Sequence, residues 1–283
     1  MSGVRVAALQ MRSGTDPAAN RAAFEALVRE AAGKGAKYVQ SPEMTGVLVR
    51  GREALMGRIR PEGEDALVRR ASELARELSI FVHLGSTAIL LEGGKVANRS
   101  FLFGPDGARI ATYDKIHMFD VDLDQGESWR ESATYAPGAR TLVAALPFAR
   151  VGLSVCYDLR FPQLFRAQAL AGAEVLAVPA AFTRQTGEAH WHVLTRARAI
   201  ENGAWLIAAA QGGKHEDGRD TFGHSLIVDP WGRIMAEADH DEPAVVLAEI
   251  DPAASAEARR KIPNLKNARE FSVEEATFRE VVA

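Results

Sequence analysis

The chain has 283 residues, a hydrophobic content of 47% and a charged content of 25%, which are ordinary values for a globular protein. Its net charge of −3 at pH 7 argues against nucleic-acid binding and against a basic membrane-binding surface. A single cysteine excludes an internal disulfide, and no apolar run approaches the roughly 20 residues of a membrane span. Since the N-terminal segment also lacks a signal-peptide pattern, we expect a cytoplasmic protein.

The N-terminal part predicts a β-α-β unit followed by a second helix and strand. Residues 4–9 form the first predicted strand, a helix begins at Pro17, and residues 37–40 form a short second strand. The two strands are expected to be parallel and joined by a right-handed crossover. Apolar residues at helical spacing then predict an amphipathic helix over 67–78, and residues 80–85 form the strand after it.

Two hairpins with similar turns lie far apart in the chain. Gly104-Pro-Asp-Gly107 and Asp229-Pro-Trp-Gly232 each separate two short apolar strands, and each hairpin follows a strand expected to be parallel. Between them lie a strand at 151–155, a helix from Pro162, a strand at 175–179 and a helix at 189–202. The two halves therefore share the order strand, helix, strand, helix, strand, hairpin.

This repeat predicts an α/β fold, a four-layer α-β-β-α sandwich with two mixed sheets and an internal pseudo-twofold repeat. A doubly wound single sheet is the alternative, but it places the hairpins poorly. No linker-like stretch divides the chain, so residues 1–251 are expected to form one domain. Residues 252–283, with helical patterns at 256–261 and 273–281, are expected to be a tail that packs on the domain or on a partner subunit.

Cys156, the only cysteine, lies between the strand at 151–155 and the helix that begins at Pro162. Backbone N–H groups at such a corner would lower the pKa of the thiol and could hold an oxyanion. This position indicates a nucleophile. The alternative is a small buried hydrophobic side chain, which describes most free cysteines.

Three further charged residues lie where they could assist a nucleophilic thiol. Glu43 follows a strand end behind a proline, and burial would raise the pKa of such a carboxylate enough for it to take the thiol proton. Lys115 follows the first hairpin and could stabilise an oxyanion, whereas Glu131 is a loop charge without an assigned role. The alternative for each is a solvated surface charge.

The sequence contains no Walker loop, no dinucleotide-binding glycine pattern and no metal-binding cysteine set, so we expect neither a cofactor nor a metal. His190 and His192 could form a metal-binding pair, but no carboxylate or cysteine lies at ligand spacing in the sequence. A structural or substrate-facing role is therefore favoured for both. His224 is interpreted as a hydrogen-bonded strand histidine.

Three motifs together resemble the nitrilase superfamily of carbon–nitrogen hydrolases: Ser41-Pro-Glu43, Tyr113-Asp-Lys115 and Val155-Cys-Tyr-Asp-Leu-Arg-Phe-Pro162. They occur in the order and at the separations found in that family. The resemblance extends to about Asp251 and includes 187–191, 196–202 and 223–232. It implies the α-β-β-α sandwich described above and a homodimer formed through helices.

The resemblance also implies a Glu–Lys–Cys triad at Glu43, Lys115 and Cys156. Glu43 would take the thiol proton and later activate water, while Cys156 would attack an amide carbon and form a thioester as ammonia leaves. Lys115 and the backbone N–H of Tyr157 would hold the tetrahedral oxyanion. Glu131 matches a second family glutamate, which orients the lysine or the substrate.

Cys156-Tyr-Asp158 differs from the Cys-Trp-Glu of family members that act on nitriles, which favours a linear amide rather than a nitrile. The chain resembles the Nit-type amidase branch, and the run at 208–215 is similar to that of enzymes acting on deaminated glutathione. We therefore predict a small acidic amide substrate, with deaminated glutathione as the leading candidate. The alternatives are an omega-amidase for 2-oxo acid amides, an N-carbamoyl amide hydrolase, and a catalytically idle scaffold.

Substrate-binding residues are harder to assign. Arg160 could bind a substrate carboxylate, as the matching arginine does in related carbamoylases, or it could form a structural ion pair. The loop at 182–187 follows a strand end and is expected to line the pocket through Phe182, Thr183 and Arg184. The chain departs from the family at Ser41, where Phe or Leu is common, and at His192, where Glu is common.

Overall fold

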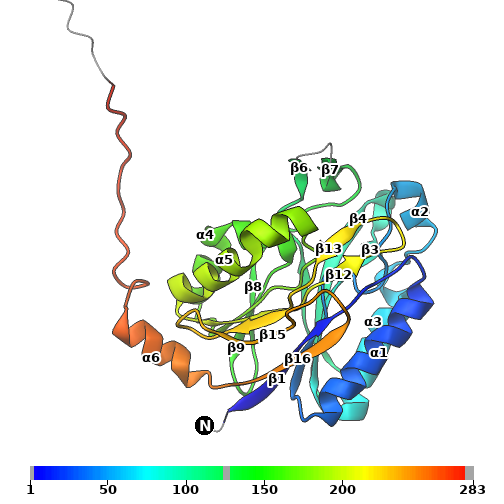
Figure 1. The fold of residues 1–283 in the computed structure, drawn as a ribbon, viewed down its shortest axis with the longest axis horizontal. Helices are drawn as coiled ribbons and strands as arrows, with labels where there is room; N and C mark the ends of the chain where they lie inside the picture. The colour runs from blue at the N-terminus through cyan, green and yellow to red at the C-terminus, as the bar shows by residue number, and fades with distance from the viewer. Residues whose placement is uncertain (1–2, 124–127, 278–283) are drawn as a thin grey trace, which may run out of the picture.

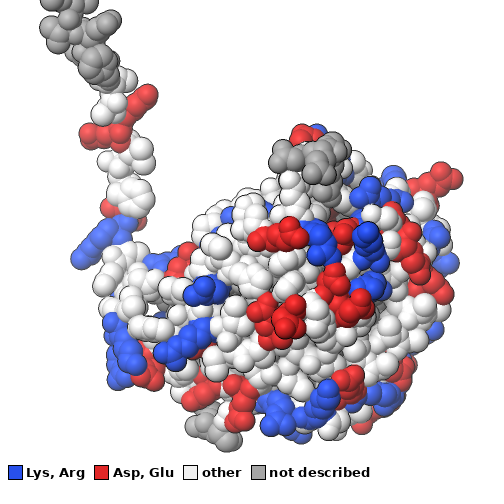
Figure 2. Space-filling view, in the orientation of Figure 1, with Lys and Arg blue, Asp and Glu red and all other residues white. Residues whose placement is uncertain are grey.

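The computed structural model describes residues 3–123 and 128–277 and contains two six-stranded mixed sheets with helices on their outer faces (Figure 1). The predicted α/β fold class, a four-layer α-β-β-α sandwich, is confirmed. None of the described helices is long and apolar enough to cross a lipid bilayer. On the face shown in Figure 2, acidic and basic side chains are interspersed.

The first sheet has the order β16-β1-β2-β3-β4-β5. Strands β1, β2 and β3 are parallel, and the other neighbours pair antiparallel. Helices α1 and α3 cover its outer face (Figure 1). The bounds are β1 Val4–Gln10, α1 Pro17–Gly33, β2 Tyr38–Gln40, α3 Ala66–Leu78, β3 Phe81–Leu90, β4 Val96–Phe103, β5 Arg109–Asp114 and β16 Ala244–Ile250.

The second sheet has the order β15-β14-β11-β10-β9-β8 and repeats the first. Its strands β9, β10 and β11 are parallel, with one antiparallel strand at one edge and an antiparallel hairpin at the other. The internal repeat predicted from the two hairpins is therefore confirmed. The bounds are β8 Leu142–Ala145, β9 Arg150–Leu153, α4 Pro162–Leu170, β10 Val175–Ala177, α5 Arg184–Asn202, β11 Trp205–Ala208, β14 Leu226–Val228 and β15 Ile234–Glu237.

Strand β1 shows how the layers are built from side-chain alternation. Val6 and Ala8 belong to the core between the sheets, whereas Ala7 and Leu9 pack toward α1 and α3. All four side chains are completely buried. A strand with both faces buried reads as a continuous apolar run rather than as an alternating pattern, and this is what the sequence shows.

Helix α5 begins five residues earlier than its apolar pattern indicated. The predicted loop at 182–187 is therefore wrong from residue 184 onward, because these residues form the first turn of α5. Thr183 is the N-cap, and its side chain accepts a hydrogen bond from the backbone N–H of Thr186. The shorter elements are α2 Arg52–Met56, β6 Asp120–Asp122, β7 Ser128–Arg130, β12 Gly212–Lys214 and β13 Asp220–Phe222, with 3₁₀ turns at Glu62–Glu64, Glu92–Gly94, Glu131–Ala133 and Cys156–Arg160.

The C-terminal segment begins with α6 (Ala253–Lys261), which packs on the second half of the sandwich. Arg259 Nε donates to the carbonyl of Asn202 at 3.0 Å, and Ser255 Oγ donates to the carbonyl of Glu174 at 2.9 Å. The helix predicted at 273–281 is not formed over 273–277, and its remainder lies outside the described residues. Residues 266–277 are exposed. The division of the chain into a domain that ends at Asp251 and a C-terminal tail remains a prediction.

Candidate active site

A cavity of about 380 Å³ opens at the carboxyl ends of β2 and β9, and both halves of the chain contribute to its wall. The side chains of Glu43, Lys115, Glu131 and Cys156 all line it. Glu43, Lys115 and Cys156, chosen from three separated sequence motifs, thus converge on one space with Glu131. Crevices at the carboxyl ends of parallel strands are the usual ligand sites of α/β folds.

Glu43 is held by a tight turn that follows β2. The turn packs so closely on β3 that a Cβ atom on Gly85 would lie 1.9 Å from the carbonyl oxygen of Ser41, so only glycine fits there. Ser41 Oγ accepts from the backbone N–H of Gly85 at 3.0 Å, and Gln211 Nε2 donates to the carbonyl of Glu43 at 3.0 Å. The hydroxyl of Ser41 therefore fixes the turn that carries Glu43.

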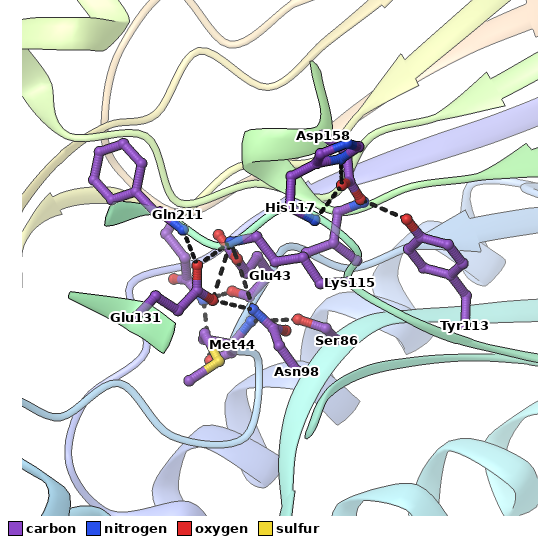
Figure 3. Close-up of polar contacts among 12 residues, drawn as sticks. Glu43, Met44, Ser86, Asn98, Tyr113, Lys115, His117, Glu131, Asp158 and Gln211 are labelled. Carbon is purple, nitrogen blue, oxygen red and sulfur yellow. Dashed lines mark hydrogen bonds and ion pairs between the residues drawn. The ribbon is translucent and has the colours of Figure 1, made fainter. Parts of the chain in front are cut away.

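Lys115 lies between two carboxylates (Figure 3). Its Nζ is 2.9 Å from Glu43 Oε1 and 2.8 Å from Glu131 Oε2. Burial alone would lower the pKa of this lysine, but the charges of Glu131 and Glu43 outweigh that effect and hold the pKa well above its usual value. Lys115 is therefore a permanent buried cation.

Asn98 on β4 was not predicted from the sequence. Its Nδ2 donates to Glu43 Oε1 at 2.8 Å and to Glu131 Oε1 at 3.3 Å, so it links the two carboxylates that flank Lys115. Its side chain is buried and lines the cavity. A polar side chain at a buried position of an apolar strand requires a polar partner. An asparagine in the segment that forms β4 was therefore the feature of the sequence that could have indicated Asn98.

Cys156 begins the 3₁₀ turn Cys156–Arg160 with a left-handed backbone, φ 51°. A non-glycine residue in this region is strained, and such strain is found preferentially at functional sites. The expected lowering of the thiol pKa is wrong. Burial and then the charge of Glu43 raise the pKa of Cys156 well above its usual value, and the ammonium of Lys115 offsets this only partly.

Asp158 joins the cysteine turn to the segment that carries Lys115 (Figure 3). Its Oδ2 accepts from the backbone N–H of Val155 at 2.8 Å and from the hydroxyl of Tyr113 at 2.7 Å. Its Oδ1 accepts from the backbone N–H of His117 at 3.1 Å and lies 2.7 Å from His117 Nδ1. Asp158 is fully buried, so these contacts fix the nucleophile relative to the cation.

We expect Asp158→Asn to lower both stability and activity. The amide of Asn can accept these hydrogen bonds at only one of its two positions, so its NH₂ group would face a backbone N–H donor, that of Val155 or that of His117. Each unsatisfied buried group costs about 1–3 kcal/mol, and we expect a loss of about 2–4 kcal/mol in the free energy of unfolding. Urea denaturation measures this. A variant as stable and as active as the wild-type protein would contradict the positioning role.

The predicted substrate-binding residues fall into two groups. Arg160, Phe182 and Thr183 line the cavity, whereas Arg184 is not among its lining residues. Arg184 pairs instead with Asp220, at 2.9 Å, and with Asp241. It is therefore engaged at the start of α5, and we do not include it in the proposed site.

Arg160 stands over the rings of Phe182 and Tyr157, with its guanidinium carbon 5.2 and 5.9 Å from the ring centroids. Its Nη1 lies 3.3 Å from His190 Nδ1. In the part of the chain that the structure describes, no carboxylate lies within ion-pair distance of it. The structural ion pair considered as the alternative is therefore not formed with any described residue.

Trp129 and two arginines, Arg50 and Arg219, also form part of the cavity wall, and the sequence analysis singled out none of the three. The guanidinium carbons of Arg50 and Arg219 lie 4.9 and 5.0 Å from the ring centroid of Trp129. All three residues line the cavity, together with Arg160. The cavity thus has acidic groups beside the thiol and guanidinium groups elsewhere on its wall.

Comparison with known proteins agrees with the fold. The carbon–nitrogen hydrolase family model matches residues 5–260, and the chain belongs to this family. Within the family it is similar to Nit-type amidases. Deaminated glutathione amidase of Yersinia enterocolitica is 38% identical over 272 residues, which cover 95% of this chain and 94% of that protein.

Two further proteins show how far the similarity reaches. Human omega-amidase NIT2 is 35% identical over 273 residues, which cover 95% of this chain and 96% of that protein. The crystal structure of the C. elegans NitFhit protein matches with a TM-score of 0.87 and 32% identity, over 95% of this chain and 66% of that one. The predicted membership of the nitrilase superfamily and its Nit-type branch is confirmed.

Proposed function

We propose that the protein is an amidase in which Cys156 attacks the carbonyl carbon of a small acidic amide and forms a thioester. The observation that carries this proposal is the convergence of a buried thiol, a carboxylate and an ammonium group on one cavity. The Glu43 carboxylate pairs with the Lys115 ammonium at 2.9 Å, and burial together with the charge of Glu43 raises the pKa of the Cys156 thiol. The same arrangement does not require a cofactor.

Glu43 acts as the general base and then as the general acid. Because the pKa of the buried thiol is raised, the thiol carries its proton at rest and needs a base within reach when it attacks. Glu43 takes that proton and passes it to the leaving nitrogen as the C–N bond breaks. In the second half of the reaction, Glu43 takes a proton from water as that water attacks the thioester carbon. The proton then passes to the leaving sulfur, which returns Cys156 as a thiol.

Lys115 and the backbone N–H of Tyr157 stabilise the oxyanion of both tetrahedral intermediates. Tyr157 is the second residue of a 3₁₀ turn, where backbone N–H groups have no acceptor within the turn. Glu131 accepts from the backbone N–H of Phe119 at 2.7 Å and thereby holds its own carboxylate against Lys115. We propose that Glu131 orients the lysine rather than exchanging protons with the substrate.

Deaminated glutathione is the leading substrate because the 38% identical Yersinia relative bears that activity in its name. The arginines of the cavity wall suit the carboxylates of such a substrate. The amide nitrogen of deaminated glutathione belongs to its cysteinylglycine unit. The leaving group is therefore the amine of cysteinylglycine. The release of ammonia predicted from the sequence applies only to a primary amide, such as the 2-oxo acid amide that an omega-amidase uses.

The experiment compares kcat/KM for deaminated glutathione, 2-oxoglutaramate and an N-carbamoyl amino acid. We expect deaminated glutathione to be the best of the three by at least about tenfold, a free-energy difference of about 1.4 kcal/mol in the transition state. Faster turnover of 2-oxoglutaramate would favour the omega-amidase alternative. The similarity to human omega-amidase NIT2, which is 35% identical, supports that alternative. Absence of turnover with all three would favour the idle scaffold.

We also propose that the protein acts as a homodimer in the cytoplasm, where a single thiol stays reduced. An apolar patch formed by Val193, Ile200, Trp231, Ile234 and Met235 supports the dimer. Val193 is 67% and Met235 50% exposed. Helix α5 and the β14–β15 hairpin carry the patch. A hydrogen bond connects them, because Arg196 Nε donates to the carbonyl of Gly232 at 2.8 Å.

Val193→Glu is expected to convert the dimer to monomers, because it places a charge in the apolar patch. Val273→Glu is the matched control, since residue 273 is exposed in the C-terminal segment outside the patch. Size-exclusion chromatography with light scattering measures the mass of each. A wild-type protein that is monomeric at micromolar concentration would refute the proposed dimer.

A further inference from the structure

Two histidines and a glutamate meet at a place that the proposed amidase chemistry does not use. His192 Nε2 lies 2.6 Å from Glu237 Oε1, and His224 Nδ1 lies 3.0 Å from the same oxygen. One nitrogen or oxygen from each residue lies within 4.8 Å of the others. None of the three residues lines the cavity around Cys156.

The fold brings these residues together from three separate elements. His192 is in α5, His224 precedes β14, and Glu237 ends β15, opposite Leu226 in the hairpin. Trp191 Nε1 donates to the carbonyl of His224 at 2.8 Å, which ties α5 to the start of β14. The carboxylate partner of His192 is 45 residues further along the chain, which is why sequence spacing did not show it.

The two imidazoles are held in place before any ligand arrives. The ring of Phe222 stacks on His224 with centroids 4.2 Å apart and meets His192 edge-on at 5.8 Å. Phe222 is buried, and a Cβ atom on Gly187 would lie 2.2 Å from its Cβ, so its position is fixed by close packing. His224 also has a strained left-handed backbone, with φ 53°.

We propose that His192, His224 and Glu237 bind a divalent transition-metal ion of the Zn²⁺ class. Two imidazoles and one carboxylate are a donor set that such ions prefer over Mg²⁺ or Ca²⁺. Zinc bonds to these groups at about 2.0–2.2 Å, so tetrahedral ligand atoms lie about 3.3 Å apart. The two contacts to Glu237 Oε1 need to lengthen by less than about 1 Å to reach this.

The ion would clamp α5 to the β14–β15 hairpin, and solvent would complete its coordination. The His192 and Glu237 side chains are 34% and 22% exposed, which leaves access from water. Binding replaces the two contacts to Glu237 Oε1 with three metal–ligand bonds, and the contacting nitrogen of each imidazole first passes its proton to the other ring nitrogen or to solvent. This role is structural, and it stands independently of the proposed amidase activity.

The test uses tag-free protein, stripped with a chelator and then titrated with Zn²⁺. We expect one Zn²⁺ per chain by elemental analysis after gel filtration, and a Tm about 5 °C higher at a free Zn²⁺ concentration of about 100 times Kd. His192→Ala should lose both effects. His190→Ala is the matched control on the same helix, and it should keep both, because His190 lies outside the cluster.

Glu237→Gln separates metal binding from a simple hydrogen-bond network. Its amide oxygen can still accept from both imidazoles, so the metal-free Tm should stay within about 2 °C of the wild-type value, while the Zn²⁺-dependent increase disappears. The proposal is overturned if the wild-type chain retains no Zn²⁺. It is equally overturned if the His192→Ala and His190→Ala variants bind the ion alike.

Discussion

Cys156→Ala is expected to reduce kcat/KM for amide hydrolysis by at least about 10⁴-fold, because no other thiol in the chain can form the thioester. The carboxylate of Glu43 and the ammonium of Lys115 remain in the variant, so water could be activated but no covalent intermediate would form. Steady-state kinetics with deaminated glutathione measure the loss. Mass spectrometry should show a trapped acyl adduct on the wild-type protein and none on the variant.

The loss should occur without unfolding. Cysteine and alanine have similar backbone requirements at φ 51°, and removal of one buried sulfur atom costs about 1 kcal/mol. A Tm within about 3 °C of the wild-type value is the control. Residual activity above a few per cent, in protein free of wild-type contamination, would show that Cys156 is not the nucleophile.

Glu43→Gln is expected to lower kcat/KM by about 10³-fold or more, because the amide cannot accept the thiol proton or deliver it to the leaving nitrogen. The substitution keeps the size and the hydrogen-bonding oxygen of the side chain, and Lys115 retains its pairing with Glu131. The loss should appear mainly in kcat. An equal rise in KM with unchanged kcat would instead indicate a role in substrate binding.

Alkylation of Cys156 by a haloacetamide distinguishes the two roles of Glu43. The negative charge of Glu43 raises the thiol pKa, so its removal should lower that pKa and increase the thiolate fraction at a given neutral pH. Because Glu43 also takes the thiol proton during attack, we expect alkylation of the variant to fall, but by much less than amide turnover, which needs Glu43 in its later steps as well. Parallel loss of alkylation and turnover would mean that Glu43 serves only to ionise the thiol.

The catalytic candidates could be proposed from the sequence because they lie in three motifs that resemble the nitrilase superfamily, and each also lies at the end of an element with a clear pattern. Glu43 follows a short apolar strand, Lys115 follows a hairpin, and Cys156 lies between a buried strand and a proline-initiated helix. The repeat of strands, helices and hairpins was likewise enough to predict the sandwich, because side-chain alternation and turn chemistry are local properties.

Contacts between distant segments could not be predicted in this way. Asn98 and Asp158 acquire their roles from partners on distant segments, and the cluster of His192 and Glu237 depends on the packing of α5 on a hairpin. The start of α5 was misplaced because Thr183 and the polar first turn mask the helical pattern. The direction of the Cys156 pKa shift depends on burial, which the local sequence does not report.

The pairing of the first strand with the last has a consequence for how the chain folds during synthesis. Strand β1 pairs antiparallel with β16 along its whole length, from Val4 opposite Ile250 to Gln10 opposite Ala244. The N-terminal sheet therefore has an open edge until nearly all of the chain has left the ribosome. Its most distant contacts form last, which predicts slow folding and a period in which β1 can pair with foreign strands. A chain truncated before β16 should aggregate, whereas one truncated after α6 should fold.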